Sequence, residues 1–141
     1  MIEVPNCFYR ISVKALVLNE ERDKFLITKE ASGEWEIPGG GLDWGETPQA
    51  DLPREIEEEM GLKVTHIAKN PSYFVTLPSV TKPGLWIANI IYETKLEHLN
   101  FTLSDECIAI DWINKENVDQ FDLFPNVPLL VEMFDPAKHS K

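Results

Sequence analysis

The chain has 141 residues, the length of a single domain, which is enough to bury a hydrophobic core. Its formal net charge of −11 disfavours binding to nucleic acid polymers or anionic membranes, because both require a positively charged surface. No apolar run is long enough to span a membrane, and the start, MIEVPNCFYR, lacks the basic and apolar regions of a signal peptide.

These features predict a cytoplasmic protein with no membrane partner. Its two cysteines, Cys7 and Cys107, do not have metal-binding spacing and are expected to be reduced thiols, with a disulfide as the alternative.

Alternating apolar residues predict the strands. In residues 9–18 the alternation involves Ile11, Val13, Ala15 and Val17, and residues 24–29 return as a second strand after a polar turn. Residues 33–40 predict a short strand that stops at Pro38, followed by a loop. Further strands are predicted over residues 63–68, 72–77, 85–96 and 107–113, separated by turns that contain Pro or Gly.

Two helices complete the pattern. Thr47 suits the N-cap, Pro48 the first helical position and Gly61 the C-terminal stop, which predicts a helix over residues 48–60. Residues 127–134 predict a closing helix. Strands with one helix in the middle and one at the end indicate an α/β sandwich built on a mixed sheet.

The first predicted helix carries an unusual density of acidic residues. One stripe of a helical projection is apolar and contains Leu52, Ile56 and Met60. The opposite arc is expected to hold Asp51, Glu55, Glu58 and Glu59. Like charges three or four positions apart cost about 0.2–0.5 kcal/mol per pair, and a divalent cation such as Mg²⁺ or Mn²⁺ would remove this repulsion. A solvated acidic face is the alternative, and it is the role expected for Glu57, outside the arc.

Three consecutive glycines, Gly39, Gly40 and Gly41, precede this helix. Glycine allows the backbone to approach a ligand or metal closely. Glycines also make ordinary turns, but their fixed distance from the carboxylates favours a ligand site.

The stretch from Gly40 to Leu62 resembles the Nudix box, G-x5-E-x7-R-E-U-x-E-E-x-G-U, in which U is a bulky aliphatic residue. Every specified position is filled, by Gly40, Glu46, Arg54, Glu55, Ile56, Glu58, Glu59, Gly61 and Leu62. The resemblance implies that residues 1–141 form a single MutT-like Nudix hydrolase domain, an α/β/α sandwich around a mixed sheet. It also implies hydrolysis of the diphosphate linkage of a nucleoside diphosphate derivative, with Mg²⁺ or Mn²⁺ as cofactor.

The same resemblance implies roles for individual residues. Glu55, Glu58 and Glu59 match the metal-binding carboxylates of the family, and the Gly40 carbonyl would add a further oxygen. Arg54 and Glu46 match a pair that braces the loop and helix and orients Glu55.

The general base stays open between a box glutamate and Glu106, which precedes a predicted strand. An exposed charge at the strand end is the alternative role for Glu106, and its neighbour Asp105 is a weaker candidate.

Two residues depart from the family pattern. Asp51 stands where the family usually has a small residue, and it either favours the helix dipole or supplies an outer oxygen to the metal site. Pro53 cannot donate to the Gln49 carbonyl and is expected to kink the helix or loosen its first turn.

The substrate is less specified than the chemistry. Gly39 and Gly41 are candidate backbone contacts, Lys29 is a candidate phosphate-binding cation or a surface lysine, and Trp44 is a candidate for stacking on a base. A nucleoside triphosphate or related nucleotide, cleaved by a monomer or homodimer, is the first expectation.

Two alternatives remain. One is an ADP-ribose or nucleotide-sugar pyrophosphatase, weakly supported by Pro78 at 16 residues beyond Leu62. The other is a Nudix-fold regulatory module that binds a nucleotide without hydrolysing it.

Overall fold

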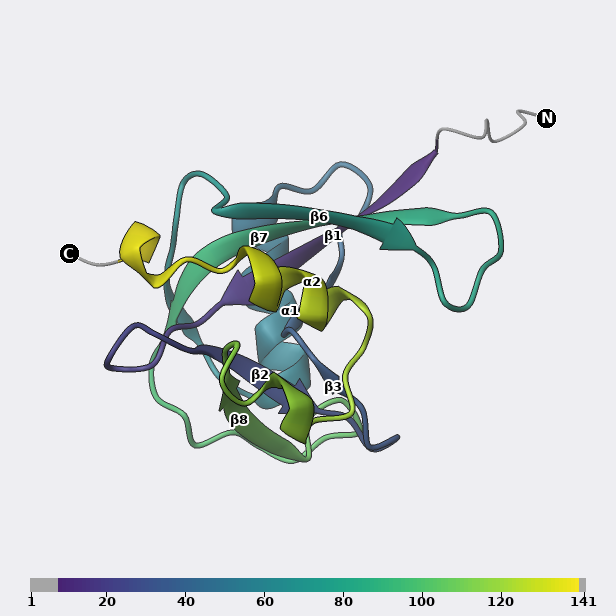
Figure 1. The fold of residues 1–141 in the computed structure, drawn as a ribbon. Coiled ribbons are helices and arrows are strands. Elements are labelled where there is room, and N and C mark those ends of the chain that lie inside the picture. Colours follow the sequence, from purple (N-terminus) through teal and green to yellow (C-terminus); the bar gives the residue numbers. More distant parts are fainter. Residues whose placement is uncertain (1–7, 140–141) are drawn as a thin grey trace.

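Residues 8–139, which the computed structural model describes, alternate between strands and helices in an order close to the predicted one (Figure 1). The strands and α-helices are β1 (Tyr9–Leu16), β2 (Phe25–Lys29), β3 (Trp35–Glu36), β4 (Gly39–Gly41), α1 (Pro48–Met60), β5 (Val64–Ile67), β6 (Tyr73–Pro78), β7 (Trp86–Leu96), β8 (Ala109–Ile113) and α2 (Asn126–Met133). Short 3₁₀ helices at Val118–Gln120 and Pro136–His139 flank α2. None of the helices in this part of the chain is long and apolar enough to cross a membrane. Cys7 lies outside the described residues, and Cys107 is a buried free thiol.

The strands form one five-stranded mixed sheet and one three-stranded antiparallel sheet. In the larger sheet, β7 pairs in parallel with β1 along one edge and antiparallel with β6 and β5 along the other. β4 extends this sheet by pairing antiparallel with β1, and the smaller sheet has the order β3-β2-β8. The predicted mixed sheet is therefore confirmed.

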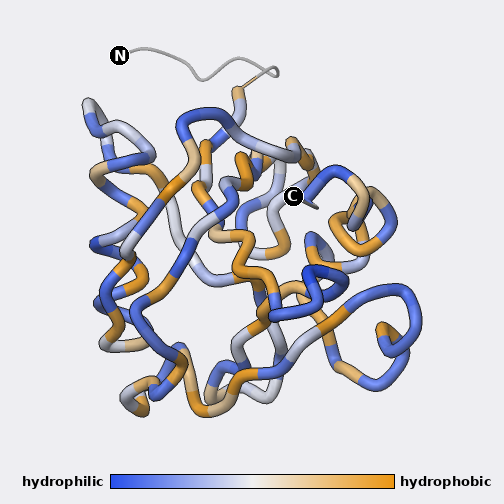
Figure 2. Tube along the Cα trace, turned by 90° about the vertical axis from the view of Figure 1, so that its left-hand side faces the viewer, coloured by the Kyte–Doolittle hydropathy of each residue, from blue (hydrophilic) through white to orange (hydrophobic). Residues whose placement is uncertain are grey.

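The two α-helices lie on opposite sides of the sheets, which gives the predicted α/β/α sandwich (Figure 1). Val13 of β1 packs in the core cluster that contains the α1 stripe of Leu52, Ile56 and Met60, and all four side chains are fully buried. Leu16 of the same strand packs in a second cluster with α2. Figure 2 shows hydrophobic segments running through the middle of the molecule and mostly hydrophilic loops around it. Both faces of β1 are therefore covered.

Helix α1 begins and ends where its capping residues predict. The Thr47 hydroxyl accepts a hydrogen bond from the Ala50 amide at 3.3 Å, and Gly61 has the left-handed φ of 67° that ends the helix. Pro53 lies inside the helix without interrupting it. The Asp51 amide still bonds the Thr47 carbonyl at 2.9 Å, so the predicted loosening of the first turn is wrong.

The glycines were expected in a loop but form the strand β4, which is a correction to the sequence prediction. Gly39, Gly40 and Gly41 pair with Lys14, Val13 and Ser12 of β1. A β-carbon on Gly39 would lie 2.1 Å from the Val13 carbonyl oxygen, and Gly39 has a φ of 135°. Glycine has a low strand propensity, so this pairing is determined by the close backbone contact and not by local preference.

The fully buried position of Ile56 generates a stability prediction. Ile56→Ala is expected to lower the free energy of unfolding by about 2–5 kcal/mol, because it leaves a cavity between α1 and β1. Urea unfolding measures the change, and Leu103→Ala, at a residue that is 72% exposed, is the matched control. A loss for Ile56→Ala as small as the control's, within about 0.5 kcal/mol of the parent, would contradict this packing of α1.

Candidate active site

The Glu59 carboxylate lies on the buried side of α1, against Gly39, the first residue of β4. Its Oε1 accepts a hydrogen bond from the Gly39 amide at 3.0 Å, and the residue is only 4% exposed. The prediction that Glu59 lies on the arc opposite the apolar stripe is therefore wrong. Seven residues span about two helical turns, so Glu59 lies almost directly in line with Leu52 on the buried side.

Glu55 lies one turn earlier and is half-buried against Gly40. A β-carbon on Gly40 would come within 2.6 Å of the Glu55 Oε2 atom. The absence of a side chain at Gly40 therefore makes room for the Glu55 carboxylate. This close approach explains the glycine in terms of packing, independently of any ligand at its carbonyl.

Arg54 gathers four carboxylates around its guanidinium. Nη2 lies 2.5 Å from Asp51 Oδ1, 3.0 Å from Asp43 Oδ2 and 3.1 Å from Glu55 Oε1. Nη1 lies 2.8 Å from Glu58 Oε1. The structure therefore brings Arg54, Glu55 and Glu58 together, as the sequence predicts.

Glu46, the predicted partner of Arg54, does not join this group. Its side chain is exposed, its amide donates to the Asp43 carbonyl at 3.0 Å, and none of the ion pairs that Arg54 makes within residues 8–139 is with Glu46. The predicted Glu46–Arg54 brace is wrong for this arrangement. Asp51 is three positions before Arg54, where one helical turn places the two side chains side by side, and it occupies the guanidinium instead.

Asp51 has partners that neither of its expected roles includes. It is 2% exposed, and its Oδ2 accepts a hydrogen bond from the Asp43 amide at 3.0 Å. Burial acts to raise the pKa of Asp51, but the Asp43 amide and the Arg54 guanidinium outweigh burial and hold this pKa below its ordinary value. Asp51 is therefore a buried anion that connects the loop before α1 to the helix.

The remaining carboxylates are electrostatically unfavourable where they lie. Burial raises the pKa of Glu59 to about 8, against the opposing effects of Lys14 and the Gly39 amide. Burial also raises the pKa of Glu55, assisted by the charges of Glu58 and Asp51 and opposed by Arg54. Additional positive charge at this position would relieve both residues.

The carboxylates suit a hard cation chemically but do not converge on one point. Within the described part of the chain, no group of three or more His, Cys, Asp or Glu side chains is gathered closely enough to hold a metal ion. Glu55 and Glu58 pair with Arg54, and Glu59 pairs with the Gly39 amide. Their oxygen atoms are the donors that Mg²⁺ and Mn²⁺ prefer. Binding such an ion would require these side chains to exchange their present partners.

The loop that carries Glu106 is attached to the C-terminal end of α1. The Ser104 hydroxyl donates to the Glu59 carbonyl at 2.6 Å, and the Thr102 amide donates to the Met60 carbonyl at 2.8 Å. Glu106 is exposed, and its charge contributes to the raised pKa of Glu59. The chain therefore folds so that Glu106 lies near the acidic helix, and its role as a base stays a prediction. The backbone carbonyl of its neighbour Asp105 accepts a hydrogen bond from the Ala31 amide at 2.8 Å.

The residues predicted to contact the substrate lie in different parts of the structure. The Lys29 Nζ atom lies 5.9 Å from the centre of the Trp35 ring, as a cation–π pair of the smaller sheet. Trp44 is fully exposed in the loop before α1. A β-carbon on Gly41 would lie 2.4 Å from Arg10 Nη2, so a guanidinium that the sequence did not single out covers this glycine.

A cavity of about 270 Å³ opens beside β1, between the β6–β7 loop and the start of α2. Its polar lining contains Lys14, Glu36, Asn89 and Asn126. The Asn126 Nδ2 atom donates to Glu36 Oε1 at 2.7 Å and to Asn89 Oδ1 at 3.4 Å, and Lys14 Nζ lies 3.8 Å from Glu36 Oε2. Asn126 is 5% exposed, and within residues 8–139 its Oδ1 atom is a buried acceptor without a hydrogen-bond partner. A small shift of the Asn126 side chain would open this atom to an N–H or O–H group of a ligand.

These cavity residues were missed by the sequence analysis, although a weak signal was present. Asn89 interrupts an apolar strand pattern, Lys14 takes a polar position of the alternating first strand, and Asn126 directly precedes the predicted closing helix. Polar residues at such positions normally face solvent, so the pattern alone did not separate them from surface residues. Pro78, which also lines the cavity, was predicted only as a weak marker of the substrate.

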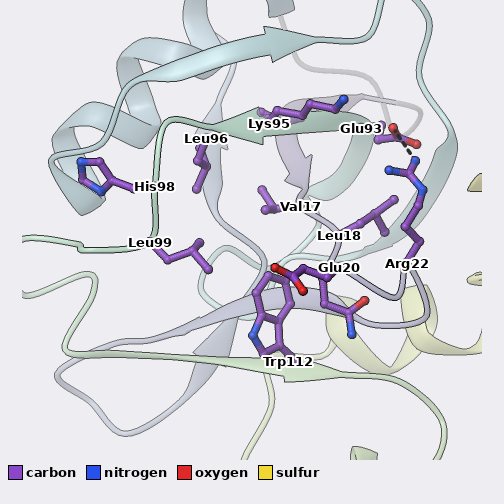
Figure 3. Close-up of a pocket in the computed structure, with 12 residues that line it drawn as sticks. Val17, Leu18, Glu20, Arg22, Glu93, Lys95, Leu96, His98, Leu99 and Trp112 are labelled. Carbon is purple, nitrogen blue, oxygen red and sulfur yellow. Dashed lines mark hydrogen bonds and ion pairs between the residues drawn. The ribbon is translucent and has the colours of Figure 1, made fainter.

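A second cavity, of about 320 Å³, lies elsewhere and is lined by none of the predicted site residues. Figure 3 shows Arg22 reaching Glu93 at one end of this cavity, with Trp112 and Leu99 lining another part. The Arg22–Glu93 pair is 3.1 Å long and also holds the C-terminal segment, since Glu93 Oε1 lies 2.8 Å from His139 Nδ1. These polar groups satisfy one another, so a structural role accounts for them.

Comparisons with known proteins agree with this architecture. The model of the NUDIX domain family matches residues 8–132. The chain is 29% identical over 111 residues to the nucleoside triphosphatase NudI of Enterobacter sp. (strain 638), covering 70% of this chain and 79% of the relative. It is 28% identical to a MutT-like protein of Streptomyces ambofaciens, covering 79% and 68%. The crystal structure of the MutT protein from Methanosarcina mazei Go1 superposes with a TM-score of 0.74 at 24% identity, covering 94% and 96%, which shows the same fold.

The buried Glu59 generates a pH-dependent prediction. Above pH 4.5 the unfolded chain ionises this residue, whereas the folded protein retains the proton until the pKa of about 8, so stability is lost as pH rises through this window. With chelator present, Glu59→Gln is expected to be more stable than the parent by roughly 1–3 kcal/mol at about pH 8 and equal to it at about pH 4.

Urea unfolding across this pH range measures the difference, with Glu57→Gln as the control at an exposed neighbouring residue. If the free energies of unfolding of Glu59→Gln and the parent differ by the same amount at every pH, burial does not hold the proton on Glu59.

Proposed function

The chain belongs to the Nudix family, and on that premise we propose that it is a MutT-like hydrolase that cleaves the pyrophosphate linkage of a nucleoside triphosphate with Mg²⁺ as its cofactor. The observation that carries the proposal is the position of Lys14 between the acidic helix and the polar cavity. Lys14 lines the cavity, and its charge acts on the Glu59 carboxylate. A nucleotide whose nucleobase is bound in the cavity would therefore extend its phosphates toward α1.

The carboxylates of α1 would hold the cofactor in this proposal. Glu55, Glu58 and Glu59 supply hard oxygen atoms, and the Gly40 carbonyl supplies one more. The ion, when bound, screens the phosphate charge and lowers the pKa of a water molecule. Asp43 and Asp51 would keep their contacts to Arg54, so the guanidinium would stay beside Glu55 and Glu58.

The chain's own side chains would bind and orient the nucleotide. Lys14 offers a cation between the cavity and the carboxylates, and the unpaired Asn126 Oδ1 atom offers an acceptor to an N–H group of the base. Glu106 or a box glutamate would accept the proton of the attacking water. Gly39, Gly41, Lys29 and Trp44 remain candidate contacts for parts of the substrate outside the cavity.

The substrate class distinguishes this proposal from its alternatives. The activity in the name of the NudI relative supports a nucleoside triphosphate, whereas Pro78 at the cavity is compatible with ADP-ribose or a nucleotide sugar. A binding module without hydrolysis would leave three glutamates of the box without a task. A cytoplasmic monomer or homodimer, formed by residues 1–141 as a single domain, completes the proposal.

Hydrolysis of a substrate panel tests the proposed activity. Nucleoside triphosphates, ADP-ribose and nucleotide sugars are assayed with Mg²⁺ and with chelator, and triphosphates are expected to be cleaved fastest and only with the ion. Glu58→Gln is expected to lower kcat by about 100-fold or more, since a group that stabilises charge in the transition state contributes about that much. Glu57→Gln, at the exposed neighbour, is expected to match the parent. Full activity of Glu58→Gln on every cleaved substrate would contradict the proposal.

Substitution of Asn126 tests the cavity as the base site. Asn126→Ala removes the unpaired acceptor, and it is expected to raise KM for the preferred triphosphate by about 5–10-fold, because one hydrogen bond contributes about 1 kcal/mol. kcat is expected to change less than KM, since the residue lies away from the carboxylates. Steady-state kinetics measures both values. An unchanged KM with every triphosphate would place the base outside this cavity.

A further inference from the structure

The Asp51 carboxylate is buried and fully occupied by hydrogen-bond donors. One oxygen accepts from the Asp43 amide at 3.0 Å, and the other accepts from Arg54 Nε at 3.1 Å and Nη2 at 2.5 Å. Its side chain is 1% exposed. These contacts attach the loop of residues 42–47 to the helix and orient the planar guanidinium through two of its nitrogens.

The orientation of Arg54 matters because the same guanidinium contacts two candidate metal carboxylates. Its other contacts are Asp43 Oδ2 at 3.0 Å in the preceding loop, and Glu55 Oε1 at 3.1 Å and Glu58 Oε1 at 2.8 Å on the helix. Glu55 also lies against Gly40, so a shift of the guanidinium would move a carboxylate that has little free space. Asp51 therefore acts on these two glutamates through Arg54.

Glu46 is poorly placed to provide the same support. Its side chain is exposed, and exposed ion pairs contribute only about 0–1 kcal/mol. A buried carboxylate that accepts several charge-assisted hydrogen bonds holds a guanidinium more firmly than a solvated one does. The buried acidic residue that orients Arg54 therefore lies inside the helix, whereas the loop residues Asp43, which also contacts Arg54, and Glu46 are exposed.

We propose that Asp51 is the positioning residue of this site, which holds Arg54 against Glu55 and Glu58, and that Glu46 is dispensable for this task. The inference rests on the proposed function, because it assigns Glu55 and Glu58 to the cofactor. It departs from the family resemblance, which gives the task to Glu46.

Asp51→Asn and Glu46→Gln form the matched pair of variants that tests this assignment. Asn at position 51 can still accept from the Asp43 amide, but its NH₂ group faces the Arg54 donors, so the substitution releases the guanidinium while keeping the loop contact. Asp51→Asn is expected to lower kcat by about 10–100-fold with little change in KM, as substitutions of residues that orient metal ligands do. Its affinity for Mn²⁺ in the absence of substrate is expected to fall by a similar factor. Glu46→Gln is expected to change either quantity by less than about threefold.

Arg54→Gln separates positioning from a general loss of stability. If Asp51 acts through Arg54, Asp51→Asn lowers kcat by less than about threefold further in the Arg54→Gln background, because coupled effects do not add. Urea unfolding establishes that each variant is folded under the assay conditions. Mn²⁺ affinity is measured by electron paramagnetic resonance.

Distinct results would overturn the assignment. Asp51→Asn with parental kcat and Mn²⁺ affinity, a loss of about tenfold or more for Glu46→Gln, or fully additive losses with Arg54→Gln would each contradict it. If Asp51→Asn does not fold, the comparison of Arg54→Gln with Glu46→Gln decides, since a loss in the first alone supports the assignment and a loss in the second overturns it. If the parent cleaves no nucleotide, the proposed function fails, and the Mn²⁺ affinities alone decide the role of Asp51.

Discussion

The close approach of the β4 backbone to α1 is the constraint on which the site depends. A side chain at Gly39 would collide with the Val13 carbonyl, and one at Gly40 would collide with the Glu55 carboxylate. Because both positions are glycine, Glu59 reaches a backbone amide from the buried side of the helix, and Glu55 lies beside it. Two carboxylates are thereby held in an environment that raises the pKa of both. The same strand pairing brings Lys14 of β1 to the edge of the polar cavity.

The distribution of charge around this contact explains how an acidic protein can act on an anionic substrate. Arg54 is the cation that faces Asp43, Asp51, Glu55 and Glu58, so the described ion pairs leave the acidic helix with an excess of negative charge. A divalent cation reduces this excess and offers positive charge to phosphate oxygens at the same time. Lys14 and Arg10 add cations on the β1 side of the glycines. The strongly negative net charge is therefore compatible with a nucleotide substrate when a metal ion is bound.

Local signals in the sequence predicted the elements but not their contacts. The bounds of α1 were predicted because Thr47, Pro48 and Gly61 act within one turn of the helix ends. β4 was missed because its pairing partner lies in β1, and glycine by itself does not favour a strand. Glu59 was assigned to the wrong side of α1, although its spacing of seven residues from Leu52 was available in the sequence. The partner of Arg54 and the cavity around Asn126 depend on loop paths and on strands distant in sequence, which periodicity does not specify.

The central claim is that the carboxylates beside the glycine strand exchange their present partners for a divalent ion. Nuclear magnetic resonance of the ¹⁵N-labelled protein during a Mn²⁺ titration tests this claim most directly, because the paramagnetic ion broadens the amide signals of residues that surround it. The account predicts that the amides of Gly39, Gly40 and the last turn of α1 broaden first. Broadening that begins at the Arg22–Glu93 cavity, or that affects no part of the described chain selectively, would contradict it.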